Sequence, residues 1–372
     1  MADRLTIRAI ETTPVRVPLA RTYHGSTYFM THRSTVVTRV LTYEGVVGEA
    51  YAGDEDADLP EIERIIHEEI APRLDGEDAF AVERCWELAR PATFDILRNR
   101  RLGLVATACV DAAIWDAVGK ALGQPLWRLW GGYRSRLPMI AIAGYHDSPQ
   151  TVSEEVEELR DMGFAGMKLK VGSALGLEVD LARVEEARAA GGPHFILAAD
   201  ANQKWTRNEA VRFARMVEDA GLVWLEEPCR WDNDRRWLRD VRTSAHVPVC
   251  AGQSEFSAAG CLDLMTGGSI DVCNFDSSWS GGPTEWRRVA SAAHTLGVAM
   301  AHHEEPQVAA HLLASIPHGT YVECFHPDRD PIWWNLVANR PMLVDGSIEL
   351  PDAPGLGWEL DHEYLEAYAV AT

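Results

Sequence analysis

Two lysines separated by a single residue, Lys168 and Lys170, end a short apolar run in the middle of the chain. Alternate side chains of a β-strand point to the same face, so both ammonium groups are expected on one face of a strand. Two ammonium groups placed in this way repel each other, which favours the neutral form of one of them. A neutral lysine is a base. The pair therefore indicates proton transfer, and the plain alternative is a strand end with two solvated lysines.

Three further apolar runs end in an acid or an amide, at Asp200, Glu226 and Gln253. The intervals between them are 26 and 27 residues, and each interval suits one helix and a return strand. In a (β/α) barrel the functional groups gather at the C-terminal ends of the strands. Carboxylate and amide oxygens are ligands for Mg²⁺, which keeps some of its waters. The spacing therefore predicts a Mg²⁺ site at the mouth of a barrel.

Composition and charge narrow the classes of partner. The 372 residues suit a barrel with a companion domain. A net charge of -21 without a Lys/Arg-rich run argues against a nucleic-acid partner. The start of the chain lacks the apolar core of a signal peptide, and the absence of a long uncharged apolar run predicts no membrane partner. Seven cysteines without a CxxC pair are typical of a reducing compartment, so we expect a cytoplasmic protein.

The first third of the chain predicts an α+β domain. Residues 4 to 52 have the pattern of a β-meander. A polar and aromatic stretch between its strands, residues 21 to 28, is long enough to be a functional loop. Helical periodicity then covers three stretches, residues 59–73, 79–90 and 103–121. Two glycines at 131 and 132 mark the expected boundary, which gives an N-terminal domain over residues 1–132.

Strands and helices alternate in the rest of the chain. The expected strands lie near residues 138–143, 165–170, 195–200, 223–226, 247–252, 270–275, 298–303 and 321–324. The expected helices cover residues 151–162, 177–190, 206–220, 232–243, 256–265, 283–295 and 305–314. Eight strands with seven helices favour a barrel over an open sheet. We therefore predict an α/β fold with a TIM-like barrel over residues 133–350, followed by a tail over residues 351–372.

An ordered set of motifs now carries a resemblance to a known family. The set consists of Lys168-x-Lys170, Asp200-x-Asn202, Glu226-Glu-Pro228, Asp276 and His303. It is similar to the set of the enolase superfamily, and within it of the mandelate racemase group. The resemblance covers nearly the whole chain. It implies a (β/α)7β barrel, an N-terminal capping domain completed by the C-terminal tail, a bound Mg²⁺ and a homo-oligomer.

The same resemblance implies abstraction of a proton alpha to a carboxylate. In this superfamily a lysine or histidine base acts with Mg²⁺, which stabilises the enediolate, so that pairing comes with the family and not from the residues alone. Lys170 is then the base on one face, and Lys168 reaches the substrate carboxylate. His303 ends the seventh strand, where the alternation of the strand aims it inward. Asp276, on the strand before, can hold the other ring nitrogen of His303 and fix its tautomer. Glu323 resembles the additional acid of the group that hydrogen-bonds the substrate carboxylate.

One position departs from the family pattern, because the third metal ligand is usually an acid and here it is Gln253. Three interpretations remain open. The amide oxygen of Gln253 is a neutral ligand, or Glu255 reaches in from two residues further on, or the site binds metal weakly or not at all.

The substrate class follows from the polar residues that we expect at the mouth. Tyr23 and His24 in the capping loop, with Asn202 and Asn274 on the barrel rim, suit several hydroxyl groups better than an aryl ring. We therefore predict dehydration of a sugar acid to a 2-keto-3-deoxy acid. The alternatives are a cycloisomerase or a racemase/epimerase acting on a sugar-acid lactone, an anhydro-sugar acid or a hydroxy acid. A non-catalytic binding relative is a further alternative that only Gln253 supports. Selectivity is expected from the loops at residues 20–30 and 51–56.

Overall fold

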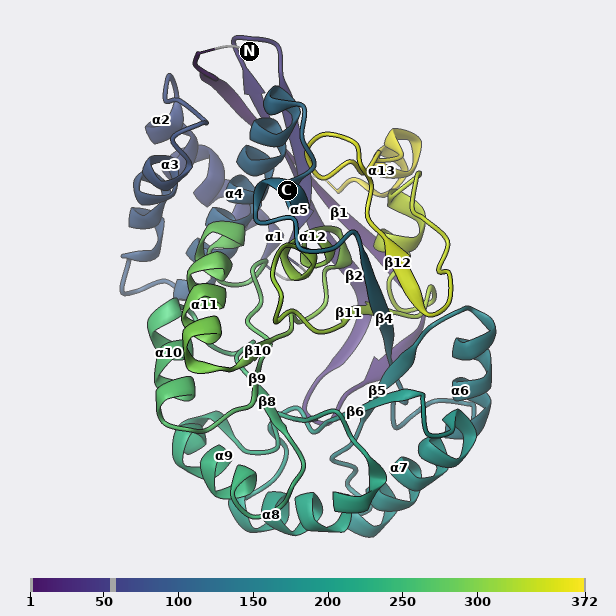
Figure 1. Cartoon of the computed structure of the whole chain (residues 1–372). Coiled ribbons are helices and arrows are strands. Elements are labelled where there is room, and N and C mark those ends of the chain that lie inside the picture. Colours follow the sequence, from purple (N-terminus) through teal and green to yellow (C-terminus); the bar gives the residue numbers. More distant parts are fainter. Residues whose placement is uncertain (1–2, 54–57, 371–372) are drawn as a thin grey trace.

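The computed structural model describes residues 3–53 and 58–370. Three antiparallel strands open the fold, in the order β1 (Ile7–His24), β2 (Phe29–Thr42) and β3 (Val47–Ala52) (Figure 1). β1 forms its ladder with β2 at the edge of this sheet, a position that tolerates Pro14 and Pro18, which have no N–H to donate.

The loop predicted over residues 21–28 is wrong in its extent. β1 continues to His24 past a register shift between Pro18 and Tyr23, and a short turn then closes the hairpin. In this turn the backbone N–H of Gly25 donates to the carbonyl of Tyr28 at 3.0 Å. The other loop expected to set selectivity, at residues 51–56, lies outside the described residues from position 54 onward.

Helices pack against the sheet of the N-terminal part. They are α1 (Leu59–Arg64), the π-helical η1 (Ile65–Ile70), α2 (Ala71–Leu74), α3 (Val82–Ala89), the 3-10 helix η2 (Arg90–Thr93), α4 (Arg100–Leu122) and α5 (Leu126–Leu129). The Asn99 side chain accepts from the backbone N–H of Arg101 and begins α4, and Gly123 ends it in the left-handed conformation. α4 is long and apolar enough to cross a membrane, but 89% of its most apolar window is buried inside the protein. It is therefore a core helix of this fold.

Eight parallel strands form the barrel, as predicted. They are β4 (Arg136–Ala143), β5 (Gly166–Lys170), β6 (Ile196–Asp200), β7 (Leu225–Glu226), β8 (Val249–Ala251), β9 (Val272–Cys273), β10 (Ala299–Met300) and β11 (Val322–Phe325). Helices connect successive strands and surround them (Figure 1), namely α6 (Val152–Asp161), α7 (Leu177–Gly191), α8 (Arg207–Met216), α9 (Asp234–Arg242), α10 (Ala258–Thr266), α11 (Gly282–Leu296) and α12 (Pro306–Ser315). Short 3-10 helices, η3 (Glu218–Ala220) and η4 (Trp231–Asn233), precede two of the later elements. The predicted (β/α)7β order is thus confirmed.

Met300 closes the barrel. Its backbone N–H donates to the carbonyl of His318 and its carbonyl accepts from the N–H of Thr320, both at 2.8 Å, just before β11. Local sequence sets the helix starts around the ring. Thr151 and Thr206 each form a capping box with the glutamate three residues later, at the starts of α6 and α8.

An apolar layer fills the barrel interior below the mouth. The layer takes one inward side chain from each of several strand segments, among them Ile140, Ala198, Trp224, Cys250, Val272 and Ala301. Because side chains alternate along a strand, the next inward positions toward the C-terminal ends carry the polar groups, Lys168, Asp200 and Glu226 among them. The polar cluster at the mouth therefore rests on a packed floor.

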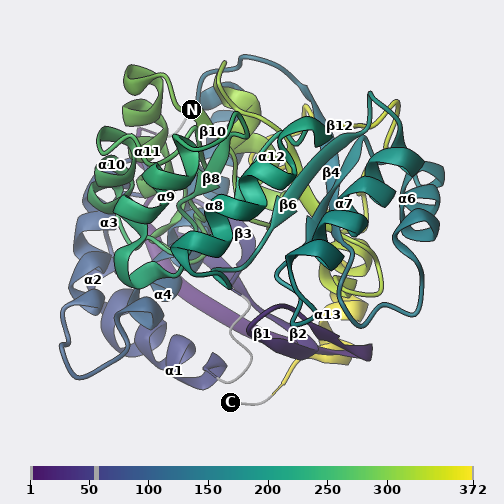
Figure 2. The same ribbon diagram turned by 90° about the horizontal axis from the view of Figure 1, so that it is seen from below.

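The C-terminal part returns to both halves of the molecule. After the π-helical η5 (Ile332–Leu336), β12 (Ser347–Glu349) pairs antiparallel with β4. α13 (His362–Tyr368) lies beside β1 and β2 (Figure 2), and the backbone N–H of Val370 donates to the carbonyl of Pro14 at 3.0 Å. The domain boundaries at residues 132 and 350 stay a prediction.

Candidate active site

The two lysines of β5 are buried and paired with acids. The Nζ atom of Lys168 lies 2.8 Å from Oε1 of Glu226 and 2.7 Å from Oε1 of Glu323. The Nζ atom of Lys170 lies 2.7 Å from Oδ2 of Asp200. Burial alone would lower the pKa of both lysines, but these carboxylates outweigh it and raise the pKa above the usual value. The repulsion expected to neutralise one lysine is therefore compensated, because each ammonium has its own carboxylate.

Asp200 and Glu226 end neighbouring strands with their side chains fully buried. Burial opposes ionisation of Asp200, yet Lys170 and Lys168 lower its pKa. Burial raises the pKa of Glu226 to about 8; Lys168 opposes that shift and Asp200 adds to it. The indole N–H of Trp224 donates to the second oxygen of Glu226 at 2.9 Å. Both carboxylates are thus held in fixed positions at the floor of the mouth.

Gln253 follows β8 and takes part in an amide network. Its Oε1 accepts from Nδ2 of Asn274 at 3.0 Å, and its Nε2 donates to Oε2 of Glu227 at 3.1 Å. Its backbone N–H donates to Oδ1 of Asn274 at 3.1 Å. Asn274 therefore supports Gln253 and does not line the cavity. Glu255 is directed elsewhere, with its Oε1 2.7 Å from Nη2 of Arg235, which argues against the interpretation that Glu255 reaches into the site.

Glu227 brings a further buried carboxylate to this side of the mouth. It has a left-handed backbone with φ of 36°, and it accepts from the Ser254 hydroxyl at 2.7 Å and from Gln203 at 3.0 Å. Burial raises its pKa, while Gln203 and Ser254 oppose the shift. A residue other than glycine is strained in this backbone conformation, so the hydrogen-bond donors around the Glu227 carboxylate hold the residue in an unusual position.

The donor set fits a hard divalent cation. Asp200, Glu226 and Glu323 contact the two lysines, and Glu227 adds a further buried acid on the Gln253 side of the mouth. Oxygen donors of this kind are the ligands that hard divalent cations prefer. Among residues 3–53 and 58–370, no three His, Cys, Asp or Glu side chains are arranged as a metal site. A metal ion beside Asp200 and Glu226 would therefore need an amide or water oxygen as well, and the Oε1 atom of Gln253 keeps a second lone pair that could serve.

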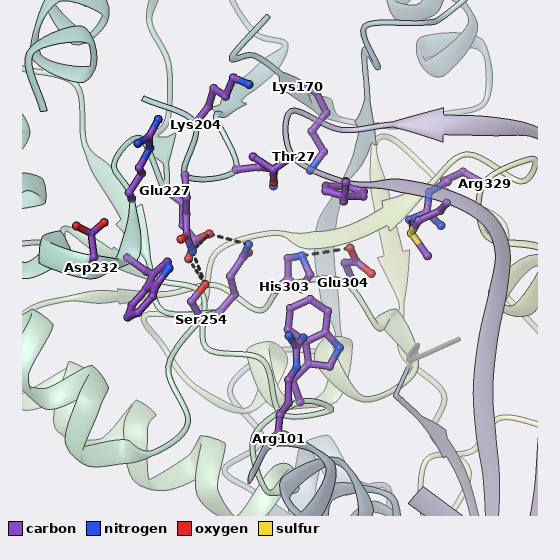
Figure 3. A pocket seen from close by; sticks show the side chains of 18 residues that line it. Thr27, Arg101, Lys170, Lys204, Glu227, Asp232, Ser254, His303, Glu304 and Arg329 are labelled. Carbon is purple, nitrogen blue, oxygen red and sulfur yellow. Dashed lines mark hydrogen bonds and ion pairs between the residues drawn. The ribbon is translucent and has the colours of Figure 1, made fainter. Parts of the chain in front are cut away.

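His303 lies across the mouth from Lys170 and contacts two acids. Its Nδ1 is 2.9 Å from Oδ2 of Asp276, which confirms the predicted contact, and its Nε2 is 3.1 Å from Oε1 of Glu304 (Figure 3). Burial disfavours a charged ring, but Glu304 and Asp276 outweigh it and raise the pKa of His303 well above its usual value. Asp276 is itself fixed by the backbone N–H and the hydroxyl of Ser278. The imidazole is thus held in its protonated form.

A cavity of about 750 Å³ opens above this cluster (Figure 3). Four of the predicted site residues line it, namely Lys170, Asn202, Gln253 and His303. Six others lie beneath or behind the lining: Lys168, Asp200, Glu226, Asn274, Asp276 and Glu323. The β1–β2 hairpin covers the cavity with Thr27, Tyr28 and Met30. The site is therefore shared between the barrel and the N-terminal sheet.

The structure does not bring Tyr23 and His24 into this cavity. Tyr23 packs edge-on against Tyr145, with ring centroids 5.2 Å apart, and lines a neighbouring cavity of about 330 Å³. His24 is exposed, and its Nδ1 lies 2.7 Å from Oδ2 of Asp147. Because β1 continues to His24, these two consecutive side chains point to opposite faces of the hairpin, and Thr27, Tyr28 and Met30 cover the mouth instead.

Sequence reasoning missed several charged residues of the lining, among them Glu304, Arg329 and Arg101. Glu304 has a left-handed backbone with φ of 53°, and its Oε2 lies 3.4 Å from Nη1 of Arg33 on β2. Arg329 follows β11, and Arg101 on α4 stacks over Trp279 at 3.8 Å from the ring centroid. One feature of the sequence could have indicated Glu304, because this acid directly follows His303.

Comparisons with known proteins agree with this geometry. Residues 7–131 match the mandelate racemase / muconate lactonizing enzyme N-terminal domain, and residues 151–364 match the enolase C-terminal domain-like family. A 3,6-anhydro-alpha-L-galactonate cycloisomerase of Streptomyces coelicolor is 30% identical over 98% of this chain and 99% of its own. An arabinonate dehydratase of Saccharolobus solfataricus is 27% identical over 90% of each chain.

A solved structure extends the likeness to the whole fold. A mandelate racemase/muconate lactonizing enzyme from a marine actinobacterium, crystallised in complex with magnesium, is 56% identical with a TM-score of 0.94, covering 99% of this chain and 100% of its own. Family profiles and this likeness both span the N-terminal sheet and the barrel. The chain therefore belongs to the mandelate racemase/muconate lactonizing enzyme family of the enolase superfamily, and it is a lyase or isomerase whose chemistry begins with abstraction of the proton alpha to a carboxylate.

Proposed function

We propose that this enzyme dehydrates a polyhydroxy sugar acid to a 2-keto-3-deoxy acid. The observation that carries the proposal is the position of His303 between Asp276 and Glu304, at 2.9 and 3.1 Å. Two carboxylates keep the imidazole protonated, so it is ready to donate a proton to a leaving hydroxyl group. A racemase would also need this imidazole to act as the base in one direction of the reaction, and the two carboxylates disfavour its neutral form.

Asp200, Glu226 and the amide oxygen of Gln253 are the proposed ligands of Mg²⁺. The related enzyme from a marine actinobacterium was crystallised with this ion. Bound there, Mg²⁺ would neutralise the negative charge that develops on the substrate carboxylate and would compete with Lys170 for Asp200. Gln253 brings no charge, so we expect weaker binding than a third carboxylate would give.

Individual side chains of the protein carry out the remaining steps of the reaction. Lys168 donates a hydrogen bond to the substrate carboxylate, and Glu323 holds Lys168 in place. Lys170 can act as the base once it no longer shares Asp200 and has given up its proton; as the neutral amine it takes the proton from C2, and the electron pair of the C–H bond moves into the enediolate. The C3–O bond then breaks, and the hydroxide leaves as water with the proton from His303. The enol that remains takes a proton at C3 and becomes the 2-keto acid.

The lining of the cavity supports a hydroxylated substrate. Asn202, Gln203 and Ser254 present amide and hydroxyl groups beside Lys170 and His303. Such groups are suitable partners for sugar hydroxyls. The test is proton NMR of a panel of sugar acids with the enzyme and Mg²⁺ in D₂O. A 2-keto-3-deoxy product is expected, and alpha-proton exchange with epimerisation but no loss of water would contradict the proposal.

Cycloisomerisation is the second candidate, because the Streptomyces coelicolor relative is a cycloisomerase over almost its whole length. It would use the same proton abstraction but open or close a ring. A product with unchanged mass, apart from deuterium, and an altered ring would favour it in the same NMR panel.

We further propose a cytoplasmic homo-oligomer. Seven free, buried cysteines support a reducing compartment. Multi-angle light scattering of the purified enzyme tests the oligomer, and a single monomeric mass would contradict it.

A further inference from the structure

Arg329 has an unusual environment for a buried cation. It is 2% exposed and lines the active-site cavity. Its Nη2 contacts the thioether of Met30, with 2.6 Å between Nη2 and Sδ, and its guanidinium stacks 4.3 Å from the ring centroid of Phe325. Among the described residues, Nε and Nη1 of Arg329 have no hydrogen-bond partner. A buried guanidinium of this kind is costly unless an anion pairs with it.

Glu304 is an acid whose charge acts on Arg329, but it already has other partners. It lies 3.1 Å from Nε2 of His303 and 3.4 Å from Nη1 of Arg33. A thioether is a weak acceptor, so Met30 does not replace a carboxylate. Met30 and Arg329 both line the cavity, so an external anion that took the place of the thioether would give the Nη2 atom of Arg329 a charged partner.

The barrel order places this arginine away from the proposed metal ligands. The ligands belong to β6, β7 and β8, and Arg329 follows β11, which lies opposite β7 in the closed ring of eight strands. In Figure 3, Arg329 and Glu227 lie on opposite sides of His303. A substrate with its reacting carboxylate on the ligand side would extend its other end toward Arg329.

We propose that Arg329 binds a second carboxylate, so that the substrate is a sugar diacid with a carboxylate at each end. A guanidinium presents paired N–H donors that match the two oxygens of a carboxylate. This proposal rests on the proposed function only for the identity of the reacting end. The second carboxylate is recognised whether the enzyme dehydrates or isomerises its substrate.

Binding and turnover should be measured separately. Calorimetry with Mg²⁺ on the Lys170→Met variant compares three ligands of one stereochemistry: a sugar monoacid, the matching diacid and the monoacid with a terminal phosphate. We expect the diacid to bind about 100-fold more tightly than the monoacid, the size expected for a buried charged pair. Adding Arg329→Met should remove this preference, and Arg329→Lys should restore part of it.

Controls separate this result from misfolding and from the proposed reaction. Arg340→Met removes an arginine that stacks on Trp334 outside the cavity and should leave the preference unchanged. Thermal unfolding of each variant establishes that it is folded. Equal affinity for diacid and monoacid, or tighter binding of the phosphate, would overturn the diacid assignment. A diacid that binds tightly but is isomerised without loss of water would instead refute dehydration and leave the role of Arg329 intact.

Discussion

Replacing Glu304 by glutamine should lower the pKa of His303 by about 1–3 units. The Oε1 atom of Glu304 lies 3.1 Å from Nε2 of His303. At an effective dielectric constant of about 20, one charge at this distance contributes roughly 332/(20 × 3.1), or about 5 kcal/mol. That figure is an upper bound, because Asp276 keeps its contact at 2.9 Å and the glutamine oxygen still accepts a hydrogen bond.

The same change should alter activity and stability in a defined direction. If His303 is the acid, the alkaline limb of the kcat–pH profile moves to lower pH by the shift in its pKa. A histidine whose pKa is raised on folding stabilises the protein fully below about pH 6.5 and loses this contribution as pH rises through the folded pKa. The advantage of the wild type over Glu304→Gln in free energy of unfolding should therefore shrink toward alkaline pH.

Two measurements test this reasoning. Long-range proton–nitrogen NMR of the histidine rings reports the pKa of His303, and the kcat–pH profile reports its catalytic form. Glu305→Gln is the matched control, since Glu305 binds the same Arg33 at 2.8 Å and has no ion pair with His303 in the described structure. An unchanged His303 pKa in Glu304→Gln, or equal shifts in both variants, would refute the reasoning.

Four further substitutions address the metal and the two faces of the site. Gln253→Glu should tighten Mg²⁺ at least about 10-fold by calorimetry, since it adds a carboxylate to the ligand set; an unchanged affinity would remove Gln253 from that set. Glu255→Gln should leave Mg²⁺ affinity unchanged, because Glu255 pairs with Arg235, and a large loss would contradict this. Lys170→Met should abolish exchange of the substrate alpha proton with D₂O, whereas His303→Asn should abolish water loss but retain exchange; wild-type turnover in either variant would exclude that residue.

Regular elements of this protein could be predicted from the sequence because their signals are local. The alternation of inward side chains along β5 and along the stretch 298–303 predicted the directions of Lys170 and His303, although β10 itself ends at Met300, three residues before His303. The continuation of β1 to His24 was missed, because residues 21–28 are polar and aromatic, a composition that suits an edge strand as well as a loop.

The side-chain positions of residues in the loops after the strands could not be predicted in this way. Glu304 and Arg329 enter the cavity from turns after their strands, where no repeat determines side-chain direction. The left-handed backbone of Glu304 depends on the packing around it. A glycine would have indicated such a backbone in the sequence, but this position is a glutamate. The protonation of Lys170 was likewise misjudged, because its partner Asp200 lies on another strand.

Arg33 makes the barrel dependent on the sheet that covers it. This β2 side chain is 1% exposed, and its guanidinium lies within 3.4 Å of acids at Glu304, Glu305 and Asp330. A barrel separated from the sheet would lose the cation that Glu304, Glu305 and Asp330 share, and carboxylates that stay buried without a cation are strongly unfavourable. The N-terminal sheet and the barrel are therefore expected to evolve together. Recombination that replaces the sheet by one from another protein must supply an arginine at the position of Arg33, or the three acids of the barrel must change as well.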